Sequence, residues 1–219
     1  MRVLVTAGPT CEDLDDVRCL TNRSSGRTGY AVAAEALRRG HGVELVSGPV
    51  EIEPPAGARL TRIWSAADLL RECRRLFPAC DALVMAAAVA DYRPAERAAG
   101  KLKKSGGELV LRLVPTADVL AELGRAKRPG QVLVGFALES AAAAESRRSA
   151  EQKLVAKHLD LIVLNGPAAL GAAEAEVSLL AAGSAWRGPL RLGKAELARE
   201  ILDFIEKRGQ APSSGEQHP

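Results

Sequence analysis

Short apolar runs alternate with amphipathic segments along most of the chain, and this alternation is the main signal for its fold. The continuous runs predict buried parallel strands, because a strand that is covered on both faces has no polar side. Where apolar residues recur at i, i+3, i+4 and i+7, as they do from Tyr30 to Leu37, the pattern predicts a helix. Strands are predicted at 3–7, 43–47, 60–64, 82–87, 132–137 and 161–164, and helices at about 28–39, 65–77, 116–123, 141–158 and 194–205.

The order of these elements predicts an α/β fold with a doubly wound, Rossmann-like and mostly parallel sheet. Residues 177–192 could form a hairpin at one edge, and we expect the C-terminal part of the chain to make an added lobe. Residues 1–208 are expected to form a single domain. From residue 209 onward Gly, Pro, Ser and polar residues prevail, which predicts a disordered tail over 209–219.

Two stretches between these elements have other patterns. Residues 11–20 are acidic and lack helical periodicity, which predicts a long loop after the first strand. Residues 92–107 have no clear period and carry Lys101-Leu102-Lys103-Lys104 between glycines, which predicts a mobile flap that bears lysines. Over residues 108–114 three leucines share one face, a pattern that is typical of a strand.

The composition narrows the class of protein. Of the 219 residues, 47% are apolar and 26% charged, as in a globular chain with a core. Lysine and arginine total 30 against 27 for aspartate and glutamate, and aromatic residues are only 3%, so no nucleic-acid partner is predicted. The four cysteines form no C-x-x-C pair and the histidines have no ligand spacing, so no metal site is predicted. We find no signal sequence and no membrane-spanning apolar run, and we expect a cytoplasmic protein without a membrane partner.

The segment Thr21–Gly29 contains the densest set of candidate binding groups. Within it, Asn22-Arg23-Ser24-Ser25-Gly26 places an amide, a guanidinium, two hydroxyls and a glycine before the predicted helix. Free backbone N–H groups and the positive end of the helix dipole gather at such a point, so the segment favours an anion. The same residues would also make an ordinary surface turn, because short glycine motifs match by chance.

Three further loops should meet this segment at one edge of the sheet. Gly8-Pro9-Thr10, Ser47-Gly48-Pro49 and Ala87-Ala88-Val89-Ala90-Asp91 each follow a predicted strand, and ligands of doubly wound sheets bind beyond the carboxyl ends of the strands. The lysine flap could lay cations over a polyphosphate at this edge, because nucleotidyl transfer depends on positioning and positive charge. The flap could equally be a solvated basic turn, as most charge runs are.

An NAD(P)-binding oxidoreductase on a related fold is a competing class. The turn after the first strand has no G-x-G-x-x-G, since the next glycine after Gly8 is Gly26. The second strand ends in Ser47-Gly48-Pro49 rather than in an acid placed for a ribose hydroxyl. Both observations count against this class.

Seven motifs occur in order along the chain. They are Thr6-Ala7-Gly8-Pro9-Thr10, Asn22-Arg23-Ser24-Ser25-Gly26, Val46-Ser47-Gly48-Pro49-Val50, Ala87-Ala88-Val89-Ala90-Asp91-Tyr92, Lys101-Leu102-Lys103-Lys104, Gly135-Phe136-Ala137-Leu138-Glu139-Ser140, and Lys153-Leu154 followed by Lys157 and Asp160-Leu161-Ile162-Val163. Together they resemble the phosphopantothenate–cysteine ligase (phosphopantothenoylcysteine synthetase) family over about residues 3–205. In many bacteria this domain follows a flavin-dependent decarboxylase. Because the chain begins at the ligase's first strand, the resemblance implies a stand-alone ligase without flavin.

The resemblance implies an enzyme of coenzyme A biosynthesis that joins 4'-phosphopantothenate to L-cysteine. The substrate carboxylate would attack the α-phosphate of CTP, with ATP as a possible replacement and Mg²⁺ on the phosphates, to give an acyl-cytidylate and pyrophosphate. The cysteine amine would then displace CMP and form the amide. Members of the family are dimers, so a homodimer is implied as well.

The resemblance also implies roles for particular residues. Asn22 would contact the acyl-nucleotidylate and promote its conversion, Arg18 would support the same site, and Lys101 would neutralise the polyphosphate in the first step. The positions that match nucleotide-binding residues are Gly8, Ser24, Ser25, Gly26, Asp91, Asp118, Phe136, Lys153 and Lys157. The positions implied for substrate or intermediate are Ala87, Ala88, Lys103 and Lys104. Taken singly, several of these residues could be ordinary core or surface positions.

Three positions depart from the family pattern. Pro115-Thr116-Ala117-Asp118 stands where Lys-Asn-Pro-Asp is usual, Arg27 replaces a common lysine, and Leu164-Asn165-Gly166 replaces Ala-Asn-Asp. The first change lies near the predicted nucleotide pocket, so it leaves the choice between CTP and ATP open. The exact acid and amine, and a separate decarboxylase partner, are open too. The alternatives to a ligase are the oxidoreductase and a non-catalytic nucleotide-binding relative.

Overall fold

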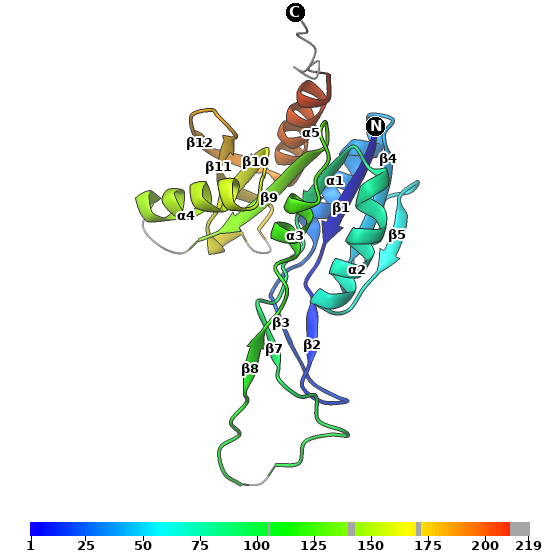
Figure 1. Ribbon diagram of the computed structural model, residues 1–219, viewed down its shortest axis with the longest axis vertical. Helices are drawn as coiled ribbons and strands as arrows, with labels where there is room; N and C mark the ends of the chain where they lie inside the picture. The colour runs from blue at the N-terminus through cyan, green and yellow to red at the C-terminus, as the bar shows by residue number, and fades with distance from the viewer. Residues whose placement is uncertain (105, 140–142, 170–171, 211–219) are drawn as a thin grey trace, which may run out of the picture.

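The computed structural model describes residues 1–104, 106–139, 143–169 and 172–210 (Figure 1). Its body is one eight-stranded sheet, with the strands in the spatial order β12 (Arg187–Gly193), β11 (Glu174–Ala181), β10 (Leu161–Asn165), β9 (Val132–Leu138), β6 (Ala82–Met85), β1 (Arg2–Ala7), β4 (Gly42–Ser47) and β5 (Arg59–Arg62). Neighbouring strands from β10 to β5 are parallel, while β11 and β12 run antiparallel at one edge. The predicted doubly wound, mostly parallel sheet is confirmed, and the strands expected in an added lobe continue this same sheet.

Helices cover both faces of the sheet. On one face α1 (Arg27–Arg38) packs beside α5 (Lys194–Gln210), and their apolar residues join one core cluster with those of the strands. On the other face α2 (Ala66–Leu76), α3 (Val119–Arg125) and α4 (Ala143–Ala156) cover a second cluster. The central strands are buried on both sides, which is why they read as continuous apolar runs. Two short 3₁₀ helices are η1 (Phe77–Ala79) and η2 (Pro167–Ala169).

Gly29 sets how closely α1 approaches the sheet. A Cβ atom at this position would lie 2.6 Å from the Cβ of Ala7 and 2.8 Å from the carbonyl oxygen of Thr6. One turn of the helix therefore rests directly on the backbone of β1. This contact places the first residues of α1 at the carboxyl ends of the parallel strands.

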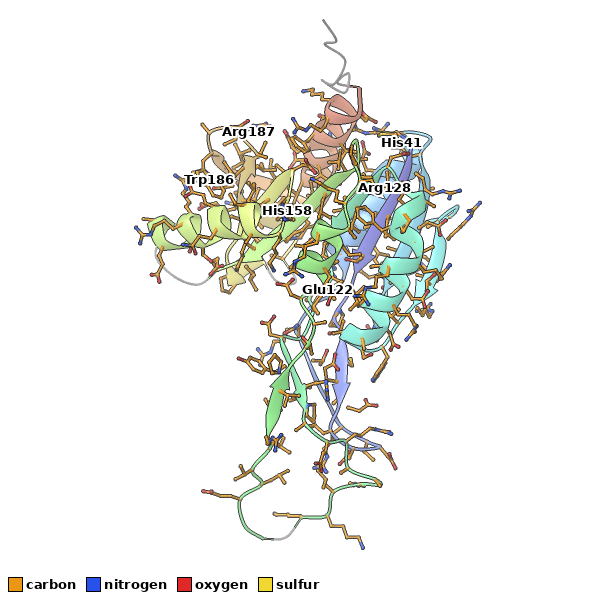
Figure 2. All side chains as sticks on the ribbon, viewed as in Figure 1. His41, Glu122, Arg128, His158, Trp186 and Arg187 are labelled. Carbon is orange, nitrogen blue, oxygen red and sulfur yellow. The ribbon has the colours of Figure 1, made fainter. Side chains whose placement is uncertain are left out.

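The opposite end of the sheet is held by polar contacts between elements. His41, just before β4, has its Nε2 atom 2.8 Å from Glu206 of α5, and Lys127 lies 2.8 Å from Asp160 just before β10. His41 and Arg128 mark this end of the body in Figure 2. The glycine-bearing loops of the predicted site lie at the other end.

A narrow arm extends from the carboxyl ends of the strands (Figure 1). It contains the antiparallel pair β2 (Cys11–Asp13) and β3 (Cys19–Thr21) and the antiparallel pair β7 (Tyr92–Pro94) and β8 (Leu113–Pro115). The chain between β7 and β8, which includes the lysine segment, forms the far end of the arm. This segment is the predicted flap.

The arm differs from what its sequence predicts. The expected loop over 11–20 is wrong, because β2 and β3 form a hairpin there. Each strand has only three residues, too few for a period to show in the sequence. The expected strand over 108–114 is also wrong except at its end. Leu109 and Val110 are 60% and 86% exposed, since no second layer of described residues covers this part of the arm.

The remaining differences concern the ends of elements. β6 stops at Met85, so Ala87 belongs to the following loop rather than to the strand. β5 stops at Arg62, two residues before the predicted end. α5 continues to Gln210, past the expected domain boundary at 208. Residues 211–219 of the predicted tail, Ser140 of the sixth motif and residues 141–142 of the predicted fourth helix lie outside the described residues.

The four cysteines are free thiols. Cys11, Cys73 and Cys80 are buried, and burial raises the pKa of Cys73 to about 12. Within the described ranges, no group of three or more His, Cys, Asp or Glu side chains could hold a metal ion. Among the helices that the structure describes, none has the length and apolar character needed to span a bilayer.

Candidate active site

Backbone contacts hold the predicted loops together at the carboxyl ends of the strands. The N–H of Ala88 donates to the carbonyl of Gly8 at 2.9 Å, and the N–H of Thr10 donates to the carbonyl of Ala88 at 3.1 Å. The loops after β1 and β6 thus pair as neighbouring strands do. Gly48 has no room for a side chain, because a Cβ atom there would lie 1.7 Å from the carbonyl oxygen of Pro9. The prediction that these loops meet at one edge is confirmed.

Gly26 connects the Asn22–Gly26 segment to α1. It takes the left-handed conformation with φ +75°, and a Cβ atom would meet Val50 at 2.9 Å and the N atom of Gly8 at 3.3 Å. No side chain in the described part of the chain caps α1. The N–H groups of Thr28 and Gly29 in its first turn are therefore available to an anion.

A cavity of about 560 Å³ opens beside this helix start, and we call it the main cavity. Most of the predicted site residues line it: Asn22, Ser24, Ser25, Gly26, Ala87, Ala88, Asp91, Phe136, Lys153 and Lys157. Gly8 does not line the main cavity, but its backbone packs closely against Gly26, which does. The structure therefore brings together residues from four distant parts of the sequence.

The amide of Asn22 is engaged with the neighbouring loop. Its Nδ2 atom donates to the carbonyl of Ala88 at 3.0 Å and to the carbonyl of Val89 at 3.1 Å. Thr10 supports the same loop, since its hydroxyl accepts the N–H of Ala90 at 2.9 Å. In this arrangement Asn22 positions the 88–89 backbone. Donation to an acyl oxygen would require it to release one of the two carbonyls.

A smaller pocket of about 220 Å³, the side pocket, adjoins the main cavity and shares Ala87, Val89, Asp91, Phe136 and Lys157 with it. Thr116, Ala117 and Asp118 line its other side. The hydroxyl of Thr116 donates to the carbonyl of Ala90 at 2.6 Å. The segment that departs from the family pattern therefore forms a wall of this pocket.

Lys153 and Lys157 enter the main cavity with carboxylate partners. The Nζ atom of Lys153 lies 2.5 Å from Glu139, and that of Lys157 lies 2.8 Å from Asp118. The hydrogen bond from Lys153 holds the pKa of Glu139 below its usual range. Burial raises the pKa of Asp118, but bonds from Lys157 and from the Ala121 N–H outweigh it and leave the pKa lowered. Both lysines are thus partly neutralised.

The structure does not bring the remaining predicted residues to the main cavity. Arg18, Lys101, Lys103 and Lys104 line a separate cavity of about 580 Å³ on the arm. Arg18 and Asn22 lie at opposite ends of β3, and Figure 1 shows the arm extending away from the sheet. The predicted grouping of Arg18 and Lys101 with Asn22 is therefore absent from the described part of this chain.

Asp15 joins the two segments of the arm. Its carboxylate, which has no exposed surface, accepts the Arg18 side chain at 3.0 Å, the Leu102 N–H at 3.0 Å and two N–H groups of its own turn at 2.8 Å. Arg18 in turn donates to the carbonyl of Leu102 at 2.9 Å. The Arg18 guanidinium holds the pKa of Asp15 well below its usual range. Leu102, between Lys101 and Lys103, is held at both its N–H and its carbonyl.

Comparison with known proteins identifies the family. A family model described as the DNA/pantothenate metabolism flavoprotein C-terminal domain matches residues 1–208. The chain belongs to this family. The coenzyme A biosynthesis bifunctional protein CoaBC of Bacillus subtilis (strain 168) is 44% identical over 171 residues, which cover 78% of this chain and 41% of that protein. A cysteine/cysteine sulfinic acid decarboxylase from an unknown prokaryotic organism is 44% identical over 165 residues, 75% of this chain and 45% of that protein. The chain spans less than half the length of these relatives.

Solved structures share the fold of this family member. A crystal structure of the C-terminal domain of CoaBC superposes with a TM-score of 0.78 at 36% identity and covers 94% of each chain. The DNA/pantothenate metabolism flavoprotein from Streptococcus pneumoniae gives 0.83 at 23% identity, over 94% of this chain and 99% of that one. A mutant of Cab2 in complex with phosphopantothenate-cysteine gives 0.79 at 17% identity, over 95% and 87%. The last two show the fold alone, while the predicted family membership is confirmed.

Several residues that line the main cavity were not among the site residues predicted from the sequence. They are Arg23, Arg27, Thr28, Ala86, Val89, Leu138, Asn165, Ala169 and Lys194. Arg23, Arg27 and Thr28 belong to the predicted loop or border it, so their proximity could have been read from the sequence. Lys194 begins α5, more than 160 residues after that loop, and no short motif marks it. Only the packing of α5 beside α1 brings it to the cavity.

Proposed function

We propose that the chain catalyses the ligation of 4'-phosphopantothenate to L-cysteine in coenzyme A biosynthesis, with CTP as the activating nucleotide. The observation that carries the proposal is the main cavity, where the start of α1, the Gly26 turn and lysines meet beside a pocket walled by Phe136. Such a site suits a polyphosphate with an attached base. The family, and the names of CoaBC and of the Cab2 complex, support this reaction and these substrates.

In the first step an oxygen of the substrate carboxylate forms a bond to the α-phosphorus, and the bond from that phosphorus to pyrophosphate breaks. The leaving pyrophosphate gains negative charge. The start of α1, with the positive end of the helix dipole, and the lysines of the cavity favour that charge. The start of α1 is fixed by the packing of Gly29 on β1, so this helix end needs no reorganisation during the step.

In the second step the cysteine nitrogen forms a bond to the acyl carbon, the carbon–oxygen bond to the phosphate breaks, and CMP leaves while the nitrogen loses a proton. Asn22 acts here through the loop that it holds, because Ala88 and Val89 line the cavity. The small side chains of Ala87 and Ala88 leave space for the acyl group. A donor to the acyl oxygen stabilises the charge that develops on it.

We place the base in the side pocket. Asp91 and Thr116 there offer polar atoms to the edge of a base such as cytosine. Mg²⁺ on a nucleotide usually takes one or two carboxylates with the phosphate oxygens. Asp91 fits this donor set, since it is the one carboxylate among the described residues that line the main cavity. When bound, Mg²⁺ would neutralise phosphate charge.

A homodimer formed through the arm is part of the proposal. Val17, Tyr92, Leu109 and Val110 are 64%, 56%, 60% and 86% exposed, and such apolar side chains on one narrow arm suit burial against a second copy. A second copy could also deliver its lysines to the main cavity, which the arm of the same chain does not reach. Mixing Lys101→Gln with Asn22→Asp chains tests this arrangement. Regained activity supports delivery of lysines between copies. Absence of activity supports a movement of the flap within one chain.

The decisive assay is release of pyrophosphate from each of the four nucleoside triphosphates with phosphopantothenate, with and without cysteine. We expect CTP to be used best, and we expect sustained turnover only with cysteine. If no triphosphate releases pyrophosphate, the result would support a non-catalytic nucleotide-binding relative instead of a ligase. Tight binding of NAD(P) would instead support an oxidoreductase.

A further inference from the structure

Lys194 lies at the main cavity although no motif of the sequence includes it. It is the first residue of α5 and directly follows β12. Its side chain lines the cavity together with Gly26, Arg27 and Thr28, the residues at the start of α1. Because α1 and α5 pack side by side, the first residues of both helices, Arg27 and Lys194, face the same space.

The surroundings of Lys194 differ from those of the other two cavity lysines. Lys153 and Lys157 each have a carboxylate within 2.8 Å, whereas no described carboxylate lies within 4.0 Å of Lys194. Its Nζ atom instead donates to the carbonyl of Ala169 at 3.3 Å, a long contact. Burial, and then the positive charge of Arg27, lower the pKa of Lys194.

A half-buried ammonium without a carboxylate partner is unfavourable unless another anion joins it. An ordinary surface lysine avoids this situation by extending its charged group into water. Lys194 instead lines the wall of the cavity, which Gly26 and Thr28 at the start of α1 line as well. A phosphate group in this position would accept hydrogen bonds from the lysine and from the helix start at once.

We propose that Lys194 is a phosphate-binding residue of the main cavity. The inference rests on the proposed function and deepens it, because it names a contact for the phosphates that the reaction brings to this site. Two substrates of the reaction carry phosphate: the triphosphate of the nucleotide and the single phosphate of the acid. Both offer the same chemistry to Lys194, so the test must separate them.

The test is calorimetric titration of the protein with inorganic tripolyphosphate and, separately, with phosphopantothenate. Lys194→Gln should weaken the binding of one of the two by about 10-fold to 100-fold, since a charge-assisted hydrogen bond is lost. Lys194→Arg keeps the charge and should stay within about threefold of the wild type. The control is Lys207→Gln, which removes an exposed lysine of the same helix and should change neither affinity.

The ligand affected identifies the source of the phosphate. Weaker binding of tripolyphosphate should be accompanied by a raised KM for the nucleotide alone, and weaker binding of phosphopantothenate by a raised KM for the acid alone. Equal affinities of Lys194→Gln and the wild type for both ligands would overturn the inference, as would failure of the wild type to bind either. If Lys194→Gln does not fold, Lys194→Met replaces it, because methionine keeps a long side chain without the charge.

The outcome for Lys194 is separate from the outcome for the ligase reaction. If the wild type releases no pyrophosphate with any triphosphate, the proposed function fails. The titrations still decide whether Lys194 binds phosphate, because they require no turnover. If pyrophosphate is released and Lys194→Gln binds both ligands normally, only the inference about Lys194 fails.

Discussion

The main cavity and the lysine segment of the arm are built in different ways. At the cavity, Gly29 and Gly48 let backbone pack directly on backbone, with no space for even a methyl group. On the arm, by contrast, the segment that carries Lys101 is held mainly by polar contacts from Asp15 and Arg18, and the nearby Leu109 and Val110 are exposed. Close packing fixes groups in place, whereas a few polar contacts at the surface permit local opening. In the proposed reaction, the groups that should be preorganised therefore lie at the sheet, and the lysines that would have to move lie on the arm.

The largest effect should come from removing a cation of the arm. If Lys101 neutralises the polyphosphate in the first step, Lys101→Gln should reduce pyrophosphate release by about 10³-fold or more, the range known for a cation that meets charge at a transferring phosphate. The fold should be retained, because Lys101 is exposed. Stopped assays of pyrophosphate measure the loss. Arg112→Gln, which removes another exposed cation of the arm, is the control, and equal rates for both variants would leave the arm without a catalytic role.

At the cavity, Asn22→Asp should act on the second step. The new carboxylate would face the carbonyls of Ala88 and Val89, which now accept hydrogen bonds from the amide. The loop should shift and turnover should fall by about 10²-fold to 10³-fold, as for a lost oxyanion-site donor. Because the first step needs no contact from this amide, phosphopantothenoyl-cytidylate should accumulate.

Mass spectrometry of small molecules released from denatured Asn22→Asp protein, after incubation with phosphopantothenate, CTP, Mg²⁺ and cysteine, detects that intermediate. Recovery of unreacted substrates alone would indicate that Asn22 is needed in the first step of the reaction. Normal product formation would reduce this loop to an ordinary turn. Asn22→Ala separates the loss of the amide donor from the effect of a new negative charge, since it removes the donor without adding a charge.

Gly29→Ala tests whether the cavity depends on close packing. The added methyl would overlap Ala7 and Thr6 and force α1 away from β1, so we expect a loss of about 1–3 kcal/mol in the free energy of unfolding. Denaturant titration measures this loss. Gly42→Ala is the matched control, because a Cβ atom there meets nothing within 4 Å, and its effect should stay below about 0.5 kcal/mol. Equal stabilities of the two variants would contradict the close packing.

Asp15→Asn should produce the smallest change, confined to the arm. It weakens the hold on Leu102, so trypsin should cleave after Lys101, Lys103 or Lys104 about tenfold faster than in the wild type, as expected when a charge-assisted hydrogen bond is lost. Asp16→Asn is the control, since Asp16 contacts only the exposed Arg97 among the described residues. Identical cleavage rates would show that Asp15 does not anchor the segment.

The same contact has a defined pH dependence. The pKa of Asp15 is lower in the folded chain than the value of about 3.9 for an unfolded aspartate. Its stabilising contribution is therefore complete above that value and is lost as the pH falls through the folded-state pKa. Proteolysis of the arm by an acid protease should stay slow at about pH 4–5 and rise only in stronger acid. Asp15→Asn should show no such rise.

Most of the body could be predicted from the sequence, because its strands and helices are long enough for a period to show. β1, β4 and α1 appear within a residue or two of their expected bounds. The three-residue strands of the arm left no such signal, and the leucines of 108–114 suggested a strand that has no covering layer. Short strands depend on their partners rather than on their own pattern.

The candidate site was predictable where its residues follow strand ends or stand in one loop. The loops at Gly8, Asn22 and Ala87 meet as expected. The position of Lys194 depends on helix packing across the sheet face, and the separation of Arg18 from Asn22 depends on the length and direction of a three-residue strand. Neither the position of Lys194 nor the separation of Arg18 from Asn22 can be inferred from a local sequence motif.

The pairing of Gly8 and Thr10 with Ala88 has a mechanical consequence. It continues the contact between β1 and β6 beyond the sheet, and the same two stretches of chain then pass into β2 and β7. The arm is thus attached to the sheet at a wall of the main cavity. We therefore expect a displacement at the far end of the arm to reach Ala88, which lines the main cavity.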